Sequence, residues 1–400
     1  MMNILQVCNK SPYPPHDGGS LASYSLMRSF SRLGHQVTLL AMCTPKHSLN
    51  TTDRETLSSM VQLYTVNVDT DVRTWRLLRN LAFSRLPYNA ERFLFPAFEK
   101  ELGCILVSAQ FDIVQLEGLY LMPYVEIIRR QSAAKVVLRA HNIEQEIWKR
   151  ISETEKNPLK KFYFSLLARR LMLFEHAAIN RYDLLVPITQ RDKEEFDRMG
   201  NLKPAFVCPA TLDGCDPISP DSIKPSNSLF FLGSLDWKPN QEGLLWFINQ
   251  VFPKVKSHHK EITFHVAGRN APDWLQDKIQ GDGVLFHGEI PDATQFMREH
   301  GILVSPCFSG GGMRVKIIEA MTQGKPVVTT SIGAEGLGAV HGKNILIGHS
   351  STEFVDHIDR LLKIPDFYVK IGTNALSFVR QHFDNMKITA DLASFYSNHL

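Results

Sequence analysis

Residues 308–319 read FSGGGMRVKIIE, in which three consecutive glycines follow a short apolar segment at 302–306 and precede a run with helical spacing. The backbone N–H groups of such a turn are exposed at the N-terminus of the following helix, where the helix dipole also favours an anion. The pattern therefore predicts a strand, a phosphate-binding turn and a helix, with Gly310, Gly311 and Gly312 against the anion.

Three charged residues follow these glycines. We expect Arg314 and Lys316 in the first helical turn, where a cation opposes the positive end of the helix dipole unless an anion is bound. Glu319 lies three residues after Lys316, on the same face of the helix, and is suited to accept hydrogen bonds from ribose hydroxyls. The alternative interpretation is a glycine-rich loop with a surface ion pair between Lys316 and Glu319.

Alternating strands and helices extend in both directions from this stretch. The first fifty residues contain an apolar strand, a turn dense in glycine and proline, an amphipathic helix and a second strand, which together form a βαβ unit and hence a parallel sheet. Further apolar segments continue the series at 111–116, 135–139, 184–188, 228–233, 262–268, 284–288, 302–306 and 326–330.

The two series predict an α/β protein with two Rossmann-like domains. Residues 204–225 are rich in proline and poor in periodic apolar positions, which is typical of a linker. We therefore place one domain at 1–205 and a second at 206–382.

Composition limits the possible functions. Hydrophobic residues make up 44% of the chain and charged residues 21%, values that exclude a disordered chain, and a net charge of +3 gives no general argument for nucleic-acid binding. The six cysteines form no C-x-x-C pair, so the spacing predicts neither a zinc site nor a disulfide framework. The N-terminus lacks the pattern of an export signal, and no apolar segment is long enough to span a bilayer. We expect a cytoplasmic protein whose membrane contact, if any, is peripheral.

Two segments, residues 73–95 and 148–170, mix arginine or lysine with large apolar side chains. Both could lie on an anionic membrane, where each basic side chain contributes about 1 kcal/mol and aromatic rings sit at the interface. The alternative is an ordinary solvated helix whose apolar face packs on the sheet.

The sequence resembles the large retaining group 1 family of bacterial GT-B glycosyltransferases over nearly its whole length. The motifs that carry the resemblance are GG at 18–19, AHNIE at 140–144, RYD at 181–183, FLGSLDWKPN at 231–240, AGRN at 267–270, GMRVKIIEAM at 312–321, GKPVV at 324–328, GAEGL at 333–337 and FVRQHF at 378–383.

The resemblance implies the GT-B fold, with two facing Rossmann-like domains and a C-terminal helix, residues 383–400, that crosses back to the first domain. It further implies a nucleoside-diphosphate sugar as donor, bound mainly by the second domain, and a glycan or lipid-linked acceptor bound by the first. The expected activity is a metal-independent transfer of a sugar, with retention, to a cell-envelope polysaccharide or glycolipid, without any cofactor besides the donor.

The same resemblance assigns site residues. Catalytic roles fall to His141, Arg314 and Lys316, with no metal ligand. The expected donor-binding set is Gly18, Gly19, Lys238, Arg269, Gly310, Gly311, Gly312 and Glu319.

Three positions depart from the family pattern. The family's first acidic residue would stand at 311, where this sequence has Gly311, and its arginine and lysine after the strand at 228–233 are replaced by Ser234 and Asn240. Charge neutralisation is then expected from Arg314 and Lys316. These departures leave open a non-catalytic, nucleotide-binding scaffold with this fold. A second alternative is a GT-B sugar-nucleotide epimerase, which would use carboxylates beside the sugar for proton chemistry, although the sequence shows no clear paired set.

Overall fold

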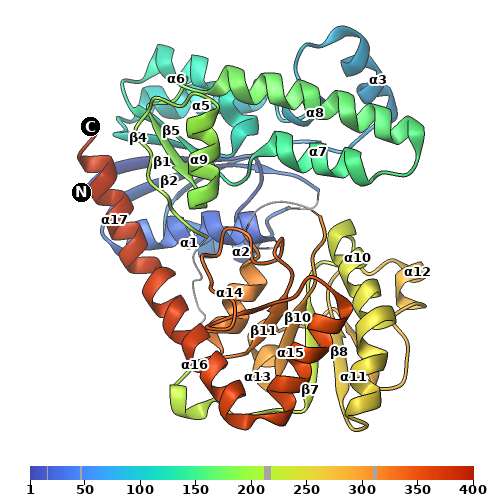
Figure 1. Cartoon of the computed structure of the whole chain (residues 1–400). Coiled ribbons are helices and arrows are strands. Elements are labelled where there is room, and N and C mark those ends of the chain that lie inside the picture. The colour runs from blue at the N-terminus through green and yellow to red at the C-terminus, as the bar shows by residue number, and fades with distance from the viewer. Residues whose placement is uncertain (16, 46, 211–217, 310–312) are drawn as a thin grey trace. The chain divides into compact units, whose positions relative to one another are not determined.

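The computed structural model describes the 400-residue chain except residues 16, 46, 211–217 and 310–312 (Figure 1). It divides into two compact units. The first comprises Met1–Asp213 together with Asn385–Leu400, and the second comprises Gly214–Asp384.

The first unit is built on a six-stranded parallel sheet with strand order β3-β2-β1-β4-β5-β6. Its strands are β1 (Asn3–Cys8), β2 (Gln36–Cys43), β3 (Gln62–Asn67), β4 (Ile113–Glu117), β5 (Lys135–Ala140) and β6 (Leu184–Pro187). All strands but the edge strand β3 are almost entirely buried, as expected for a parallel sheet covered by helices on both faces.

Helices cover both faces of this sheet. They are α1 (Gly18–Arg32), α2 (Thr51–Ser58), α3 (Thr74–Phe83), α4 (Tyr88–Glu91), α5 (Pro96–Ser108), α6 (Val125–Gln131), α7 (Glu144–Thr154), α8 (Pro158–Ala178), α9 (Gln190–Arg198) and α17 (Asn385–Ser397). One apolar core joins Leu5 and Val114 of the sheet to Phe98 of α5. The other joins Ile4 to Phe30 of α1 and to α17. Side chains that alternate along a strand thus supply both cores.

The last helix, α17, is held on the first unit by a buried hydrogen bond. The Tyr396 hydroxyl donates to Gln115 Oε1 at 2.6 Å, and its ring stacks on Phe30 with 6.1 Å between centroids. A buried hydroxyl needs such a partner, because leaving it unpaired costs more than the bond itself contributes.

The division of the chain differs from the boundaries at 205 and 382 expected from the sequence. Residues beyond 205 still extend the first sheet, because the Phe206 and Cys208 N–H groups donate to the carbonyls of Leu185 and Pro187 at 3.0 and 2.9 Å. The chain therefore passes from the first unit to the second between Asp213 and Gly214, and it returns to the first unit at Asn385.

The second unit also has a six-stranded parallel sheet, with strand order β12-β11-β10-β7-β8-β9. Its strands are β7 (Ser228–Leu232), β8 (Thr263–Ala267), β9 (Val284–Gly288), β10 (Ile302–Ser305), β11 (Val327–Thr329) and β12 (Leu346–Ile347). Its helices are α10 (Lys238–Trp246), which continues through a π-helical turn at Phe247–Val251 into α11 (Phe252–His258), α12 (Asp273–Gln276), α13 (Ala293–Glu299), α14 (Val315–Thr322), α15 (Ser351–Lys363) and α16 (Pro365–His382). Two doubly covered parallel sheets confirm the predicted α/β fold class.

Two glycines allow backbone segments at the carboxyl ends of β7, β8 and β10 to approach closely. A Cβ on Gly243 of α10 would lie 1.9 Å from the carbonyl oxygen of Pro306, and a Cβ on Gly268 would lie 1.9 Å from that of Gly233. Any side chain at either position would separate these segments. In the described part of the chain, no helix combines the length and hydrophobicity that a bilayer span requires.

Candidate functional site

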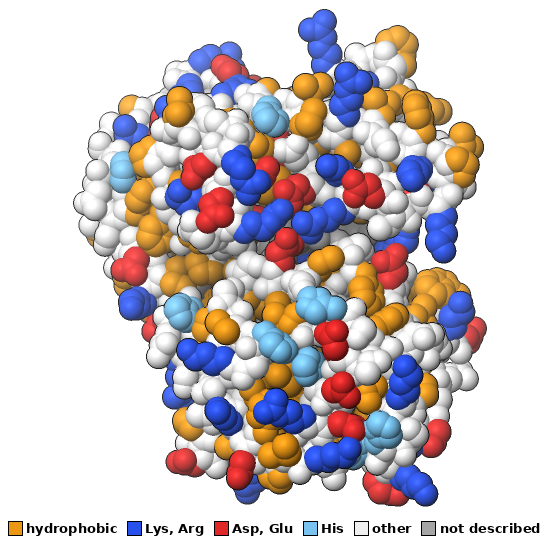
Figure 2. Space-filling view, viewed as in Figure 1, with side chains coloured by type: hydrophobic (Ala, Val, Ile, Leu, Met, Phe, Trp, Pro, Cys, Tyr) orange, Lys and Arg blue, Asp and Glu red, His pale blue; other side chains and the backbone are white. Residues whose placement is uncertain are grey.

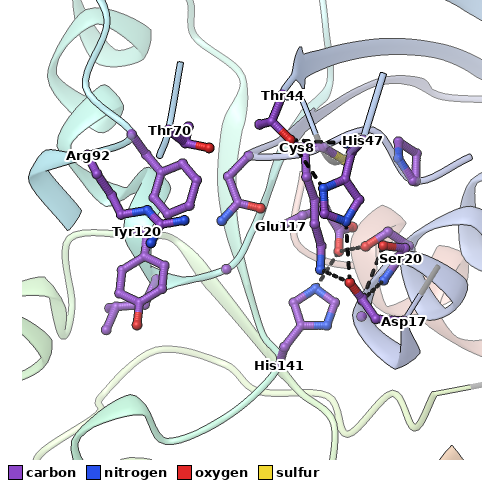
Figure 3. Close-up of a pocket in the computed structure, with 18 of the residues that line it drawn as sticks. Cys8, Asp17, Ser20, Thr44, His47, Thr70, Arg92, Glu117, Tyr120 and His141 are labelled. Carbon is purple, nitrogen blue, oxygen red and sulfur yellow. Dashed lines mark hydrogen bonds and ion pairs between the residues drawn. The ribbon is translucent and has the colours of Figure 1, made fainter. Parts of the chain in front are cut away.

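A cavity of about 510 Å³ opens in the first unit, where the carboxyl ends of β1, β4 and β5 meet the N-terminus of α1 (Figure 3). Ligands of doubly wound sheets bind at this edge. Two residues predicted from the sequence, Gly19 and His141, line the cavity together, and Gly18 is the first residue of α1 beside them.

The central group of the cavity is the buried carboxylate of Glu117, at the end of β4. His141 Nε2 lies 2.7 Å from its Oε2, and the Ser23 hydroxyl donates to the same oxygen at 2.7 Å. Gln6 donates to Oε1 at 2.9 Å, and Nε of the fully buried Arg139 lies 3.9 Å from Oε2. Burial alone would raise the pKa of Glu117, but the charge of Arg139 and the hydrogen bonds from His141 and Ser23 lower it to about 2.

This carboxylate fixes the orientation of the His141 ring. Because the ionised Glu117 accepts a hydrogen bond from the Nε2–H group, the lone pair of the ring lies on the other nitrogen, Nδ1. Nδ1 is buried without a hydrogen-bond partner among the described residues, and a Cβ on Gly19 would lie 4.0 Å from it. The imidazole therefore faces the glycine turn at the start of α1.

Asp17 holds that turn in place. Its side chain caps α1 by accepting from the Ser20 N–H at 2.8 Å, and it pairs with Lys10 Nζ at 2.5 Å and with His47 Nε2 at 3.6 Å. Burial would raise the pKa of Asp17, but the bonds from His47 and Lys10 outweigh it and the net shift is downward. A helix N-terminus with an exposed glycine backbone can accept an anion.

A second carboxylate, that of the partly buried Glu144, lies at the start of α7. The Tyr120 hydroxyl donates to Glu144 Oε2 at 2.6 Å, and burial raises the pKa of Glu144. Glu175 of α8 accepts from the backbone N–H groups of Glu144 and Gln145, both at 3.1 Å, and burial raises its pKa to about 8. These contacts fix the cavity wall that carries Glu144 and Tyr120.

Glu117, Lys10, Asp17 and Tyr120 are functional-site residues that the sequence patterns do not predict. One feature of the sequence does indicate Glu117. It is an acidic residue at the end of a mostly apolar strand, and the carboxyl ends of parallel strands form the sheet edge where ligands bind. The residues that keep Glu117 ionised include Gln6 and Arg139, which are distant from it in the sequence. No sequence pattern connects these positions.

In the second unit, Arg314 packs beside the start of α10. Its guanidinium lies 5.1 Å from the centroid of the Trp237 ring, and its Nη2 lies 3.1 Å from Cys307 Sγ and 3.3 Å from the Ser309 carbonyl oxygen. The Ser309 hydroxyl in turn donates to Glu242 of α10 at 3.2 Å. The expectation that Arg314 lies in the first helical turn is wrong, because α14 begins at Val315 and Arg314 is its N-cap residue.

Lys316 and Glu319 do lie in α14, as expected, and pair with each other at 2.6 Å. This contact is the ion pair expected by the alternative interpretation of this segment, a glycine-rich loop with a surface ion pair. The Glu319 side chain is nearly buried and Lys316 is about half exposed, so the lysine can change partner at little cost. The predicted contacts of Gly310, Gly311 and Gly312 lie outside the described residues.

The remaining predicted cations lie at neighbouring strand ends. Lys238 begins α10, directly after Trp237, and Arg269 follows β8, where its carbonyl accepts from the Leu235 N–H at 2.8 Å.

Two of the three positions that depart from the family pattern, Ser234 and Asn240, contact each other. Asn240 Nδ2 donates to the Ser234 carbonyl oxygen at 2.8 Å. At this turn the chain has a neutral hydrogen bond in place of two cations.

Comparison with known proteins gives one family and several solved structures. Residues 226–363 match the family model "Glycosyl transferases group 1". A 44.6 kDa protein in the cps region of Klebsiella pneumoniae is 25% identical over 98% of this chain and 99% of its own length.

Solved structures of the same fold are similar over nearly the whole chain. Anabaena HepE in complex with UDP-glucose has a TM-score of 0.67 at 17% identity, with both chains covered completely. TarM has a TM-score of 0.71 at 11% identity over 99% of both chains. Sucrose-phosphate synthase from Thermosynechococcus elongatus has a TM-score of 0.66 at 13% identity, covering 100% of this chain and 99% of its own.

We predict that Glu117→Gln destabilises the first unit and removes part of its pH dependence. Losing the charge leaves Arg139 buried without its counter-ion, which typically costs about 3–5 kcal/mol. The pKa of Glu117 is below its ordinary value of 4.5, so its stabilisation is complete above pH 4.5 and is lost as the pH falls toward 2. Urea denaturation at pH 7, 5 and 3.5 measures both effects.

The matched control is Glu126→Gln, because Glu126 is 72% exposed and pairs with Arg181 at the surface. This variant should keep the stability of the parent at each pH. A Glu117→Gln variant that loses as much stability as the parent between pH 5 and 3.5 would contradict the assignment of an ionised Glu117.

Proposed function

We propose that this chain, whose residues 226–363 match the group 1 glycosyl transferases, moves a sugar from a nucleoside-diphosphate sugar to a cell-envelope polysaccharide or glycolipid. The observation that carries the proposal is that the matched segment contains Arg314, Lys316 and Glu319 at the start of α14. UDP-sugars are the first donors to test, since UDP-glucose is the ligand in the similar structure of Anabaena HepE.

The second unit would bind the donor. As the sugar leaves, negative charge grows on the diphosphate, and Arg314 and Lys316 at the positive end of α14 would stabilise it. Glu319, on the face of the helix that carries Lys316, would accept hydrogen bonds from the ribose hydroxyls. Because protein cations take this role, the proposed reaction needs no metal.

The first unit would contribute His141 and the glycine turn of Gly18 and Gly19. Glu117 orients the ring, so Nδ1 would approach the reacting sugar in a fixed geometry. The exposed N–H groups at the start of α1 would lie against the diphosphate. The proposed outcome, retention at the anomeric carbon, can be read from the configuration of the product.

The relative from a capsule (cps) region supports a polysaccharide acceptor. A panel of UDP-, GDP- and dTDP-sugars, assayed for transfer and for hydrolysis, tests the donor class. Binding without turnover would favour the scaffold alternative, and isomerisation of the donor would favour an epimerase.

Glu319→Gln should weaken the binding of the donor's nucleoside diphosphate by about 10-fold or more, because a hydrogen bond to a charged group is worth roughly 1.5–3 kcal/mol. Lys316→Ala should act in the same direction. Isothermal titration calorimetry with UDP measures both. Glu261→Gln, an exposed carboxylate of the same unit, is the control and should bind as the parent does. Unchanged affinity in both test variants would mean that the donor site lies elsewhere.

His141→Ala should lower kcat by at least ~100-fold while the Kd for UDP changes little, since a group that acts on the reacting sugar contributes mainly in the transition state. His176→Ala, an exposed histidine of α8, controls for the loss of an imidazole. Equal circular dichroism spectra establish that the variants are folded. Full turnover in His141→Ala would leave the histidine with a structural role only.

We also propose that α3 and the start of α8 bind an anionic membrane surface. Trp75, Leu78, Phe83 and Phe162 are 55–87% exposed, so the apolar side of α3 does not pack on the sheet as the alternative interpretation expected. The two helices contact each other, because Arg170 of α8 donates to the carbonyl of Leu81 at 3.0 Å. Figure 2 shows hydrophobic and basic side chains together where Figure 1 labels these helices.

The basic residues of this surface are partly neutralised. Arg73 pairs with Asp69 at 2.6 Å, Arg76 lies 3.8 Å from the same carboxylate, and Arg79 lies 3.6 Å from Glu91. These pairs are exposed and worth little, so lipid phosphates can replace the carboxylates. Arginine near exposed aromatic rings is suited to the membrane interface.

Replacing Arg73, Arg76, Arg79 and Arg85 by glutamine should weaken binding to phosphatidylglycerol vesicles by about 100-fold. This loss is smaller than ~1 kcal/mol for each of the side chains would give, because the existing ion pairs with carboxylates already neutralise part of their charge. Vesicle co-sedimentation at low salt measures it, and higher salt should weaken the parent similarly. The matched control replaces Arg129, Arg130, Arg181 and Arg198, which removes the same charge elsewhere on the unit. A parent protein that ignores anionic vesicles at low salt would contradict the membrane proposal.

A further inference from the structure

Three histidines converge on one face of the second sheet. His265 lies in β8, His287 in the edge strand β9, and His300 directly after α13. One potential ligand nitrogen from each lies within 4.8 Å of the other two, and this is the only group with metal-ligand spacing among the described residues.

Sheet register explains why the first two meet. His265 pairs with Leu285, and His287 is two residues further along β9, so both imidazoles lie on the same face. His265 Nδ1 and His287 Nε2 are 2.9 Å apart. Helix α13 then brings His300 onto this face, where its ring stacks on His265 with 3.9 Å between centroids.

Within the described part of the chain, the contacts that orient these rings come from neutral groups and not from carboxylates. His265 Nε2 is held by the Thr263 hydroxyl at 2.9 Å, and the Phe296 ring packs edge-on against His300 at 4.3 Å and His287 at 5.3 Å. A hydroxyl on the far nitrogen of an imidazole is the kind of contact that orients a metal-binding histidine.

Burial favours the neutral form of His300 and of His265. Burial and the charges of His265 and His287 lower the pKa of His300 to about 4, and burial, with the charge of His287, lowers that of His265. The other charged groups that act on His300 are Glu299, which raises its pKa, and Lys325, which lowers it. Neutral imidazoles have lone pairs available for a cation.

We propose that His265, His287 and His300 bind a divalent transition-metal cation, with Zn²⁺ as the best match. Imidazole nitrogens suit Zn²⁺, Cu²⁺ and Ni²⁺, and three histidines leave one position of a tetrahedral zinc open to water. Side-chain rotations that separate the stacked rings of His265 and His300 would bring the ligand nitrogens to the ~2.0–2.1 Å of a Zn–N bond. His287 is the exposed member, on an edge strand, and can make that adjustment.

A bound metal would tie β9 and the end of α13 to β8. The edge strand β9 is only partly buried, so a link of this kind stabilises the part of the sheet with the least packing. The site involves none of the residues assigned to the donor, and its test is a direct measurement of binding.

The experiment uses the full chain without a histidine tag, treated with EDTA and dialysed. Titration with ZnCl₂ in a calorimeter should show one bound ion per chain. His265→Ala, His287→Ala and His300→Ala should each weaken that binding by at least 100-fold. His382→Ala and Cys104→Ser, which remove an exposed imidazole and an exposed thiol elsewhere, should bind Zn²⁺ as the parent does.

Two further readouts keep the proposal testable if a core variant misfolds. Zn²⁺ should raise the unfolding temperature of the parent and not that of His287→Ala, whose side chain is exposed. Bound Co²⁺ should give the strong visible absorption of a tetrahedral site. A parent that binds no zinc, or a His287→Ala variant that binds it as tightly as the parent, would overturn the proposal.

Discussion

The carboxylate of Glu117 is buried at the end of β4 and remains ionised, and the cavity of the first unit is organised around that charge. A buried carboxylate is stable only when it is paired and fully hydrogen-bonded. Here Arg139 supplies the charge, while Gln6, Ser23 and His141 supply hydrogen bonds. One consequence is that His141 cannot rotate away from the glycine turn at the start of α1. The histidine that we propose to act on the sugar is thereby oriented before any ligand arrives.

The second unit relies on close backbone approach instead of buried charge. Gly243 and Gly268 let the segments after β7, β8 and β10 lie against one another, and this proximity brings Trp237, Ser309 and Arg314 into contact. Lys316 remains about half exposed, where it can exchange its protein partner for a ligand at little cost. The unit that would hold the charged donor is thus the one with adaptable side chains.

Both surfaces proposed as binding sites outside the cavity combine residues that are remote in sequence. The apolar side of α3 stays exposed beside α8, and the three histidines of the second sheet come from two strands and a helix end. At both surfaces, side chains stay accessible that could have been packed in the core or paired with another residue. Such groups are more informative about binding than the well-paired interior.

The sequence alone determined the fold class, because the periodicity of its apolar segments and the glycine-rich turns specify local strands, turns and helices. It also located His141, Lys316 and Glu319 on the elements where the structure has them, since each follows a recognisable strand or glycine turn. Only the tertiary structure decided which groups meet: Glu117 with His141, Arg314 with Trp237, and His265 with His287 and His300. Even the start of α14 after Arg314, and the boundary at Asp213, depended on contacts beyond the local pattern. The physical reason is that propensity and hydrophobic period act over a few neighbouring residues. The pairing of charges and rings depends instead on strand order and register, which are set by the packing of the whole sheet.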